Sequence, residues 1–154
     1  MMIATSKSKE RVKAGEVFTP ATTVFEMILQ PCIRDVISDL DKTVLDPACG
    51  QGQFSCTELF FKMFFNLDKL DDSNALRALY SLKAIDIRKD NVAECKKHLL
   101  ETFDQAYYYL LGKPTSDELF YLAYCIVDNI VIQGDSLKMM QEWAAEESGQ
   151  QKLF

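Results

Sequence analysis

The chain has 154 residues, of which 48% are hydrophobic and 26% are charged. This length fits one ordinary domain that can bury a sizeable core. The formal net charge of -6 and the pI near 4.8 argue against binding to nucleic acid by bulk electrostatics alone. They leave open a module whose nucleic-acid contacts come from another segment or chain.

Five cysteines are spread along the chain without a Cys-x-x-Cys pair, and the single histidine, His98, has no zinc-like spacing to them. An odd number of cysteines without a signal peptide predicts a reducing compartment, where thiols act as small apolar side chains. No apolar run reaches the roughly 18 residues that a membrane span needs. We therefore expect a cytoplasmic protein with no membrane association and no metal.

The start of the chain is polar. Residues 1–14 are partly basic and predict a flexible arm ahead of one domain at 15–154. This arm is either a solvated tail or a contact to phosphates. Thr19 and Pro20 then predict a helix start, with Thr19 as the cap and Pro20 in the first helical position. Pro31 ends or kinks that helix.

Three short apolar runs predict β-strands that end in an acid, at 43–47, 82–87 and 129–135. Helical patterns fill the remaining chain, at about 52–67, 71–81, 90–111, 116–127 and 137–147. Alternating strands and helices predict an α/β fold: a parallel sheet of about three strands with flanking helices and right-handed crossovers.

Several residues mark helix ends. Asp90 is a candidate N-terminal cap, Gly112 a C-terminal stop, and Thr115 with Glu118 has the spacing of a capping box. The helix at 52–67 is apolar around more than half its circumference, so we expect neighbours on two sides of it. Its apolar residues are Phe54, Leu59, Phe60, Met63, Phe64 and Leu67.

Polar signals fall at the carboxyl ends of all three predicted strands, where open α/β sheets bind ligands. Asp46 precedes a loop with Gly50 and Gly52, and glycines let a ligand approach the backbone where a Cβ would collide. The next helix would present free N–H groups. Asp86 suits the two hydroxyls of a ribose, and Asp135 closes the third strand. Each acid alone could instead cap a helix, and a Gly-x-Gly turn alone is common.

Two sequence motifs that bind phosphates are absent, and this limits the class of ligand. The chain has no Gly-Lys-Ser or Gly-Lys-Thr phosphate loop, and Ser55 stands where a dinucleotide fingerprint needs its third glycine. Pyrophosphate is therefore disfavoured. A nucleoside with a short zwitterionic tail fits better.

Four segments in this order resemble motifs of the S-adenosylmethionine-dependent N6-adenine DNA methyltransferases. They are "GEVFTP" from Gly15, "DPACGQGQF" from Asp46, "AIDIRKDNV" from Ala84 and "IVIQGDSL" from Ile130. The resemblance covers about residues 15–138, and Gln51 replaces the more usual Ser or Thr. It implies a partial Rossmann-like methyltransferase fold and S-adenosylmethionine as the cofactor.

The resemblance also implies a role for each matching residue. Asp86 would hold the ribose hydroxyls, Ile87 would pack on the adenine face, and Asp135 would accept from the adenine amino group with Leu137 nearby. Asp46 would face the ammonium group of the methionine moiety, and Phe54 would belong to the core. The methionine end would lie on Asp46, Ala48, Gly50 and Gly52, with Phe18, Thr19 and Pro20 closing over the cofactor.

The family's fourth-strand motif, Asn/Asp/Ser-Pro-Pro-Tyr/Phe, is absent from the chain. That motif binds a flipped-out adenine. The final "QQKLF" is similar to the lead-in to that strand, so we expect this polypeptide to stop before its catalytic loop and to carry no catalytic residue. It would act on DNA, as in restriction–modification, only with further sequence or a partner subunit.

The missing strand has a structural consequence. In the family's strand order, 3-2-1-4-5-7-6, the strand at 43–47 would be central, and without a fourth strand it becomes an edge. We expect residues 43–45 to be covered by the tail or by another chain, in a homodimer or a heteromer.

Other functions stay open at this point. The chain could be a non-catalytic protein that keeps the half-fold as a cofactor sensor or a protein-interaction module. It could also be a small-molecule or protein methyltransferase. Cys49 is either a nucleophile or a small residue that a tight loop requires.

Overall fold

The structure, a computed structural model, describes residues 19–151. Phe18 and the arm at 1–14 lie outside the described residues. The described part holds seven α-helices, a short 3-10 helix (η1) and three strands, which confirms the α/β class. The bounds are α2 Ala21–Ile28, α3 Pro31–Ser38, β1 Val44–Asp46, α4 Gln53–Phe65, η1 Leu67–Lys69, α5 Asp72–Tyr80, β2 Leu82–Asp86, α6 Lys89–Leu111, α7 Asp117–Ile130, β3 Val131–Gln133 and α8 Ser136–Gln151.

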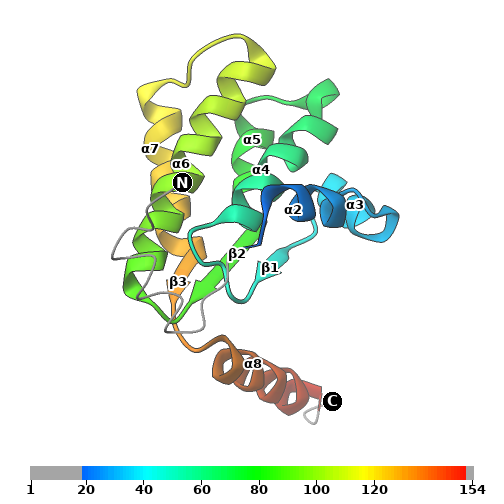
Figure 1. The fold of residues 1–154 in the computed structure, drawn as a ribbon, viewed down its shortest axis with the longest axis vertical. Helices are drawn as coiled ribbons and strands as arrows, with labels where there is room; N and C mark the ends of the chain where they lie inside the picture. Colours follow the sequence, from blue (N-terminus) through cyan, green and yellow to red (C-terminus); the bar gives the residue numbers. More distant parts are fainter. Residues whose placement is uncertain (1–18, 152–154) are drawn as a thin grey trace, which may run out of the picture.

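The three strands form one parallel sheet in the order β1-β2-β3 (Figure 1). Val44 aligns with Leu82, and Ala84 aligns with Val131. The sheet therefore confirms the predicted set of parallel strands, and β1 is an edge strand as expected.

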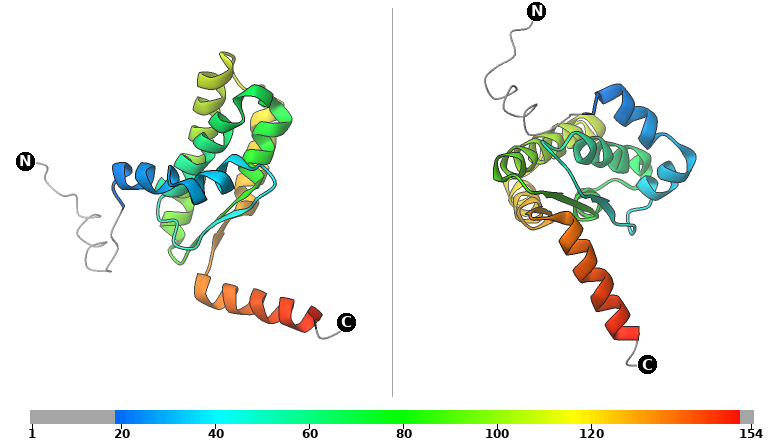
Figure 2. Two further views of the ribbon diagram at one scale, coloured as in Figure 1. Left: turned by 90° about the vertical axis from the view of Figure 1, so that its right-hand side faces the viewer. Right: turned by 60° about the horizontal axis from the view of Figure 1, so that its bottom comes forward.

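Each connection between strands contains a pair of helices. The pair α4 and α5 joins β1 to β2, and the pair α6 and α7 joins β2 to β3. Helix α4 packs on α6, α5 packs on α7, and all four contact β2 (Figure 2). Because both pairs share the central strand, one continuous core forms around fully buried residues such as Leu59, Leu99, Phe103 and Val127.

Helix α4 has neighbours on two sides, which confirms the expectation from its apolar pattern. It packs against α6 on one side and against α2 and α3 on the other. The second contact forms a smaller core cluster of Val24, Ile28, Ile37 and Phe61. The end of the pattern is less buried, since Phe64 and Leu67 stay 44% and 43% exposed. None of the helices within residues 19–151 is long and apolar enough to cross a membrane.

Two predictions about the first helices need correction. Thr19 does not cap α2, because Pro20 occupies the capping position and no side-chain cap forms. Pro31 does end the first helix, but it also begins a second one, α3, in which it stands in the first turn. Proline suits that position because its missing N–H would have no partner there.

Other helix ends differ in detail from the predictions. Ser116 caps α7 by accepting from the N–H of Leu119 at 3.1 Å. The predicted capping box is therefore wrong, and the Thr115 hydroxyl donates to Asp104 instead. Gly112 ends α6 with φ 68°, as predicted, while Asp90 lies in its first turn rather than at its cap.

The last helix, α8, begins beyond β3 and projects away from the body (Figure 1, Figure 2). Strand β1 lies at the opposite edge of the sheet. Within the described residues, α8 therefore does not cover the β1 edge, which leaves another chain as the expected cover.

Candidate functional site

A cavity of about 340 Å³ lies at the carboxyl ends of the strands. Its walls come from the loops after β1, β2 and β3, because parallel strands end at the same edge of a sheet. Five of the residues proposed as cofactor contacts line it: Ala48, Asp86, Ile87, Asp135 and Leu137. The remaining lining residues are Pro47, Gly134 and Ser136.

Asp86 is the most connected acid of this cavity. Its Oδ2 accepts from the N–H of Gly50 at 3.0 Å. Its Oδ1 accepts from the N–H of Arg88 at 2.8 Å and from the amide of Asn91 at 3.3 Å. A carboxylate offers about four lone pairs, so these donors leave room for one further hydroxyl. Accepting from two ribose hydroxyls would require one of these bonds to open.

Asp135 does cap a helix, which was the alternative to a ligand contact. Its Oδ1 accepts from the N–H groups of Leu137 and Lys138, at 3.1 and 3.3 Å. Its Oδ2 makes no hydrogen bond within the part of the chain that the structure describes. The side chain can therefore stabilise the start of α8 and still accept from a ligand.

Two apolar side chains stand at the cavity without a packing role of their own. Ile87 is 68% exposed and Leu137 is 72% exposed. Both line the cavity: Ile87 follows β2, and Leu137 lies in the first turn of α8 after β3. Exposed aliphatic groups beside polar acceptors can cover the faces of a planar ring while the acceptors read its edge.

Asp46 lies at the end of β1, and its side chain hydrogen-bonds to residues that follow it in the chain. Its carboxylate accepts from the N–H of Ala48 at 3.4 Å and from the hydroxyl of Ser55 at 3.2 Å. Burial raises the pKa of Asp46, with a smaller contribution from the charge of Asp86, while its two donors oppose the rise. Ser55, which replaces the third glycine of a dinucleotide fingerprint, therefore holds the carboxylate of Asp46, although Asp46 itself does not line this cavity.

Glycine is required at positions 50 and 52 by backbone conformation, and at position 52 also by a close neighbour. Gly50 and Gly52 both have positive φ, 53° and 93°, which other residues rarely adopt. A Cβ on Gly52 would lie 3.0 Å from the sulfur of Cys95 on α6. The close approach predicted for a ligand is, at Gly52, an approach of the loop to its neighbouring helix.

The upstream motif and Cys49 do not join the cavity. Thr19 and Pro20 precede α2, and neither of them lines it. Cys49 is only 5% exposed, and its thiol donates to the carbonyl oxygen of Gly50 at 3.6 Å. Reactive cysteines are partly exposed, so this burial favours the small-residue interpretation of Cys49. Among the described residues, no group of three or more His, Cys, Asp or Glu side chains could hold a metal ion.

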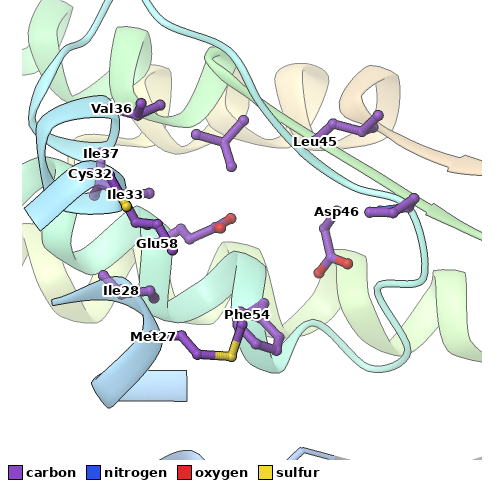
Figure 3. A pocket seen from close by; sticks show the side chains of 12 residues that line it. Met27, Ile28, Cys32, Ile33, Val36, Ile37, Leu45, Asp46, Phe54 and Glu58 are labelled. Atoms are coloured by element: carbon purple, nitrogen blue, oxygen red, sulfur yellow. The ribbon is translucent and has the colours of Figure 1, made fainter. Parts of the chain in front are cut away.

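A second hollow, of about 410 Å³, lies beside the free edge of β1 (Figure 3). We call it the edge groove. Apolar side chains from α2, α3, β1 and α4 form most of its wall, and the polar side chains are Asp46 and Glu58. Its lining consists of Met27, Ile28, Cys32, Ile33, Val36, Ile37, Val44, Leu45, Asp46, Pro47, Phe54 and Glu58.

Glu58 is the residue that sequence reasoning missed. It is 8% exposed, and it makes no hydrogen bond or ion pair within residues 19–147. Burial, together with the charge of Asp46, raises its pKa to about 8, although Lys62 opposes the rise. Its carboxyl group is therefore largely neutral at pH 7. One turn away, Lys62 is fully buried and donates to the carbonyl oxygens of Asp39 and Lys42, at 2.9 and 3.1 Å.

Comparison with protein-family models, curated proteins and solved structures found no match to this chain.

Proposed function

We propose that this chain is the S-adenosylmethionine-binding portion of a DNA adenine-N6 methyltransferase of the restriction–modification type. Its fold would be a partial Rossmann-like methyltransferase fold. Methyl transfer would need further sequence or a partner subunit, because the chain has no Asn-Pro-Pro-Tyr-like motif to hold the target base.

The observation that carries the proposal is the convergence of five side chains on one cavity. Asp86 and Asp135 supply acceptors, while Ile87 and Leu137 supply exposed apolar surface. The first acid and its apolar neighbour follow one strand and the second pair follows another, so one local turn does not explain all four. The volume of about 340 Å³ lies near the lower end of small-ligand sites.

In this proposal the cofactor's adenosine part would lie over the ends of β2 and β3. Asp86 would accept from the ribose, Asp135 would accept from the adenine amino group through Oδ2, and Ile87 would cover the ring. Asp46 and the loop with Gly50 would hold the methionine end. The cofactor would supply an activated methyl group, and the protein would supply its position.

Titration calorimetry with S-adenosylmethionine tests the proposal directly. Asp135→Asn keeps the capping oxygen but turns the second acceptor into a donor, so we expect about ten-fold weaker binding, the loss of one charge-assisted hydrogen bond. Ile87→Ala should weaken binding several-fold. Tyr80→Ala is the matched control, because Tyr80 on α5 is also exposed, at 65%, and does not line the cavity. Absence of binding by the unaltered chain would refute the proposal.

The edge groove favours one alternative function. A non-catalytic protein with a methyltransferase-like fold could act as a cofactor sensor or as a protein-interaction module. A methyl-transfer assay on DNA with the cofactor separates the cases: transfer restored by an added subunit supports the half-enzyme, and binding without transfer under any pairing supports the sensor. Transfer by this chain alone would contradict the role given to the missing motif.

A further inference from the structure

The edge groove has a strand edge as one wall. The N–H of Val44 donates to the carbonyl oxygen of Ser81 at 2.9 Å, so Val44 points its backbone groups at β2. Alternate residues of a strand point these groups to opposite sides. The N–H and C=O of Leu45 therefore point away from β2, toward the free edge. An extended segment laid there would find both partners that a strand needs.

The opposite wall suits the side chains of such a segment. Ile33 and Val36 on α3 lie across the groove from Leu45, and Met27 on α2 extends along it beside Phe54 (Figure 3). Met27 is 42% exposed, although its neighbour Ile28 belongs to the smaller core cluster. A strand added to β1 would send every second side chain toward this apolar wall.

Glu58 adds a chemical requirement. Its side chain reaches into the groove and points toward Asp46 (Figure 3). Lys62, whose charge acts on Glu58, already donates to two backbone carbonyl oxygens through its Nζ. The Glu58 carboxyl group has no hydrogen-bond partner among the described residues, and burial together with the neighbouring Asp46 disfavours its ionised form. An occupant with a cationic donor would stabilise the ionised Glu58.

From these observations we propose that the edge groove binds an extended segment of a different polypeptide, one that carries a lysine or arginine among alternating apolar residues. The basic side chain would reach Glu58 while the backbone pairs with Leu45. This inference deepens the partner requirement of the proposed function, and it rests on that function for the expectation that a partner exists.

Charge complementarity argues against a second copy of the chain as the occupant. If two β1 edges paired, each groove would receive residues 43–47, which bring another Asp46 instead of a cation. The basic residue next to this stretch, Lys42, lies 4.0 Å from Asp39 of its own chain. The occupant is therefore expected to be a heterologous chain.

Selection from a displayed library of random short peptides against the full chain provides the test. We expect enriched peptides to alternate apolar residues around a lysine or arginine, and to protect the amide of Leu45 from hydrogen exchange. The Val36→Asp variant has a charge in the apolar wall. When it is the target of the same library, none of these peptides should be enriched. Peptides without a basic residue, or equal enrichment on Val36→Asp, would overturn the inference.

Substituting Glu58 and the basic residue of the peptide, separately and together, tests whether these two side chains pair. One enriched peptide, labelled for fluorescence anisotropy, should bind Glu58→Leu at least ten-fold more weakly and Glu58→Gln several-fold more weakly. The same peptide with leucine in place of its basic residue should bind Glu58→Leu more tightly than the unaltered chain. Glu118→Gln is the control, because Glu118 is exposed on α7 away from the groove. Equal affinities across the Glu58 variants would contradict the assignment.

The two proposals can fail separately. Calorimetry with S-adenosylmethionine on the same samples reports on the cavity, while peptide binding reports on the groove. Peptide binding without cofactor binding would remove the proposed function and leave the groove assignment standing. Sedimentation of the chain alone decides the remaining case, since a dimer broken by Val36→Asp would show that a second copy is the occupant.

Discussion

The cavity at the strand ends and the edge groove differ in what their polar groups already do. In the cavity, Asp86 accepts from Gly50, Arg88 and Asn91, and Asp135 accepts from the first turn of α8. In the groove, Glu58 makes no hydrogen bond within residues 19–147. One region uses its acids to hold the fold together, and the other keeps an acid buried without such a use.

This difference changes how a substitution should be interpreted. Removing an acid from the cavity disturbs the loops themselves, so a loss of ligand binding can follow from a loss of structure. Removing the carboxyl group of Glu58 from the groove should instead raise the free energy of unfolding. Stability measurements without any ligand therefore separate the two regions.

The largest expected effect is on the pH dependence of stability in Glu58→Gln. The folded pKa of Glu58, about 8, lies above its ordinary value of 4.5. The folded state therefore binds this proton more tightly, and its stability falls as pH rises from about 4.5 to 8. Glu58→Gln should remove this fall and raise the free energy of unfolding by about 3–5 kcal/mol at pH 9, with little change at pH 4. Urea unfolding at both pH values measures it, and equal slopes for the two proteins would contradict the burial of an unpaired acid.

The next effect has the opposite sign. Asp86→Ala takes an acceptor away from Gly50, Arg88 and Asn91, and we expect the free energy of unfolding to fall by about 3 kcal/mol. Urea unfolding without cofactor is the measurement. Unchanged stability would mean that the hydrogen bonds of Asp86 do not stabilise the fold. Asp86 and Glu58 would then no longer differ in this respect.

The glycine loop allows a smaller test with a matched control. Gly52→Ala combines φ 93° with a Cβ 3.0 Å from the sulfur of Cys95, whereas Gly112→Ala has φ 68° and open space. We expect losses of about 2–3 and about 1 kcal/mol in the free energy of unfolding. Equal losses would show that backbone conformation alone, and not the approach of α6, requires glycine at position 52.

The smallest effect concerns the acid that lines the groove and begins the loop. Ser55→Ala removes the hydroxyl that donates to Asp46 at 3.2 Å. The pKa of Asp46, already raised by burial, should rise further, and stability should fall by about 1 kcal/mol. Carbon-detected titration of the Asp46 carboxyl group by NMR measures the shift. A pKa that falls would assign the Ser55 contact to a different protonation state.

Much of the fold followed from local signals. The strands at β1 and β2 were predictable because short apolar runs end at Asp46 and Asp86. The third strand was predicted too long: residues 129–130 belong to α7, which continues into β3 without any turn residue that would mark the boundary. Helix α3 was missed because Pro31 also suits the first turn of a new helix.

The candidate site was predictable in part for a similar reason. The acids at strand ends converge because all parallel strands end at one edge, so a sequence pattern suffices. Glu58 carries no such signal, since an acid four residues before Lys62 usually indicates an exposed helix face. Its burial results from α2 and α3 packing across α4, a contact between distant segments that no local pattern encodes.

The direct joints between helices and strands limit where the chain can change length. Helix α7 ends at Ile130 and β3 begins at Val131, and only Ser81 separates α5 from β2. Neither connection has loop residues that could absorb a change in length. One inserted residue would therefore shift the following strand by one position and exchange the side chains on its two faces. The loop between Asp46 and Gln53 starts from the other end of the sheet and does not set the strand register. An insertion there would disturb the hydrogen bond between Gly50 and Asp86 but would leave the two faces of each strand unchanged.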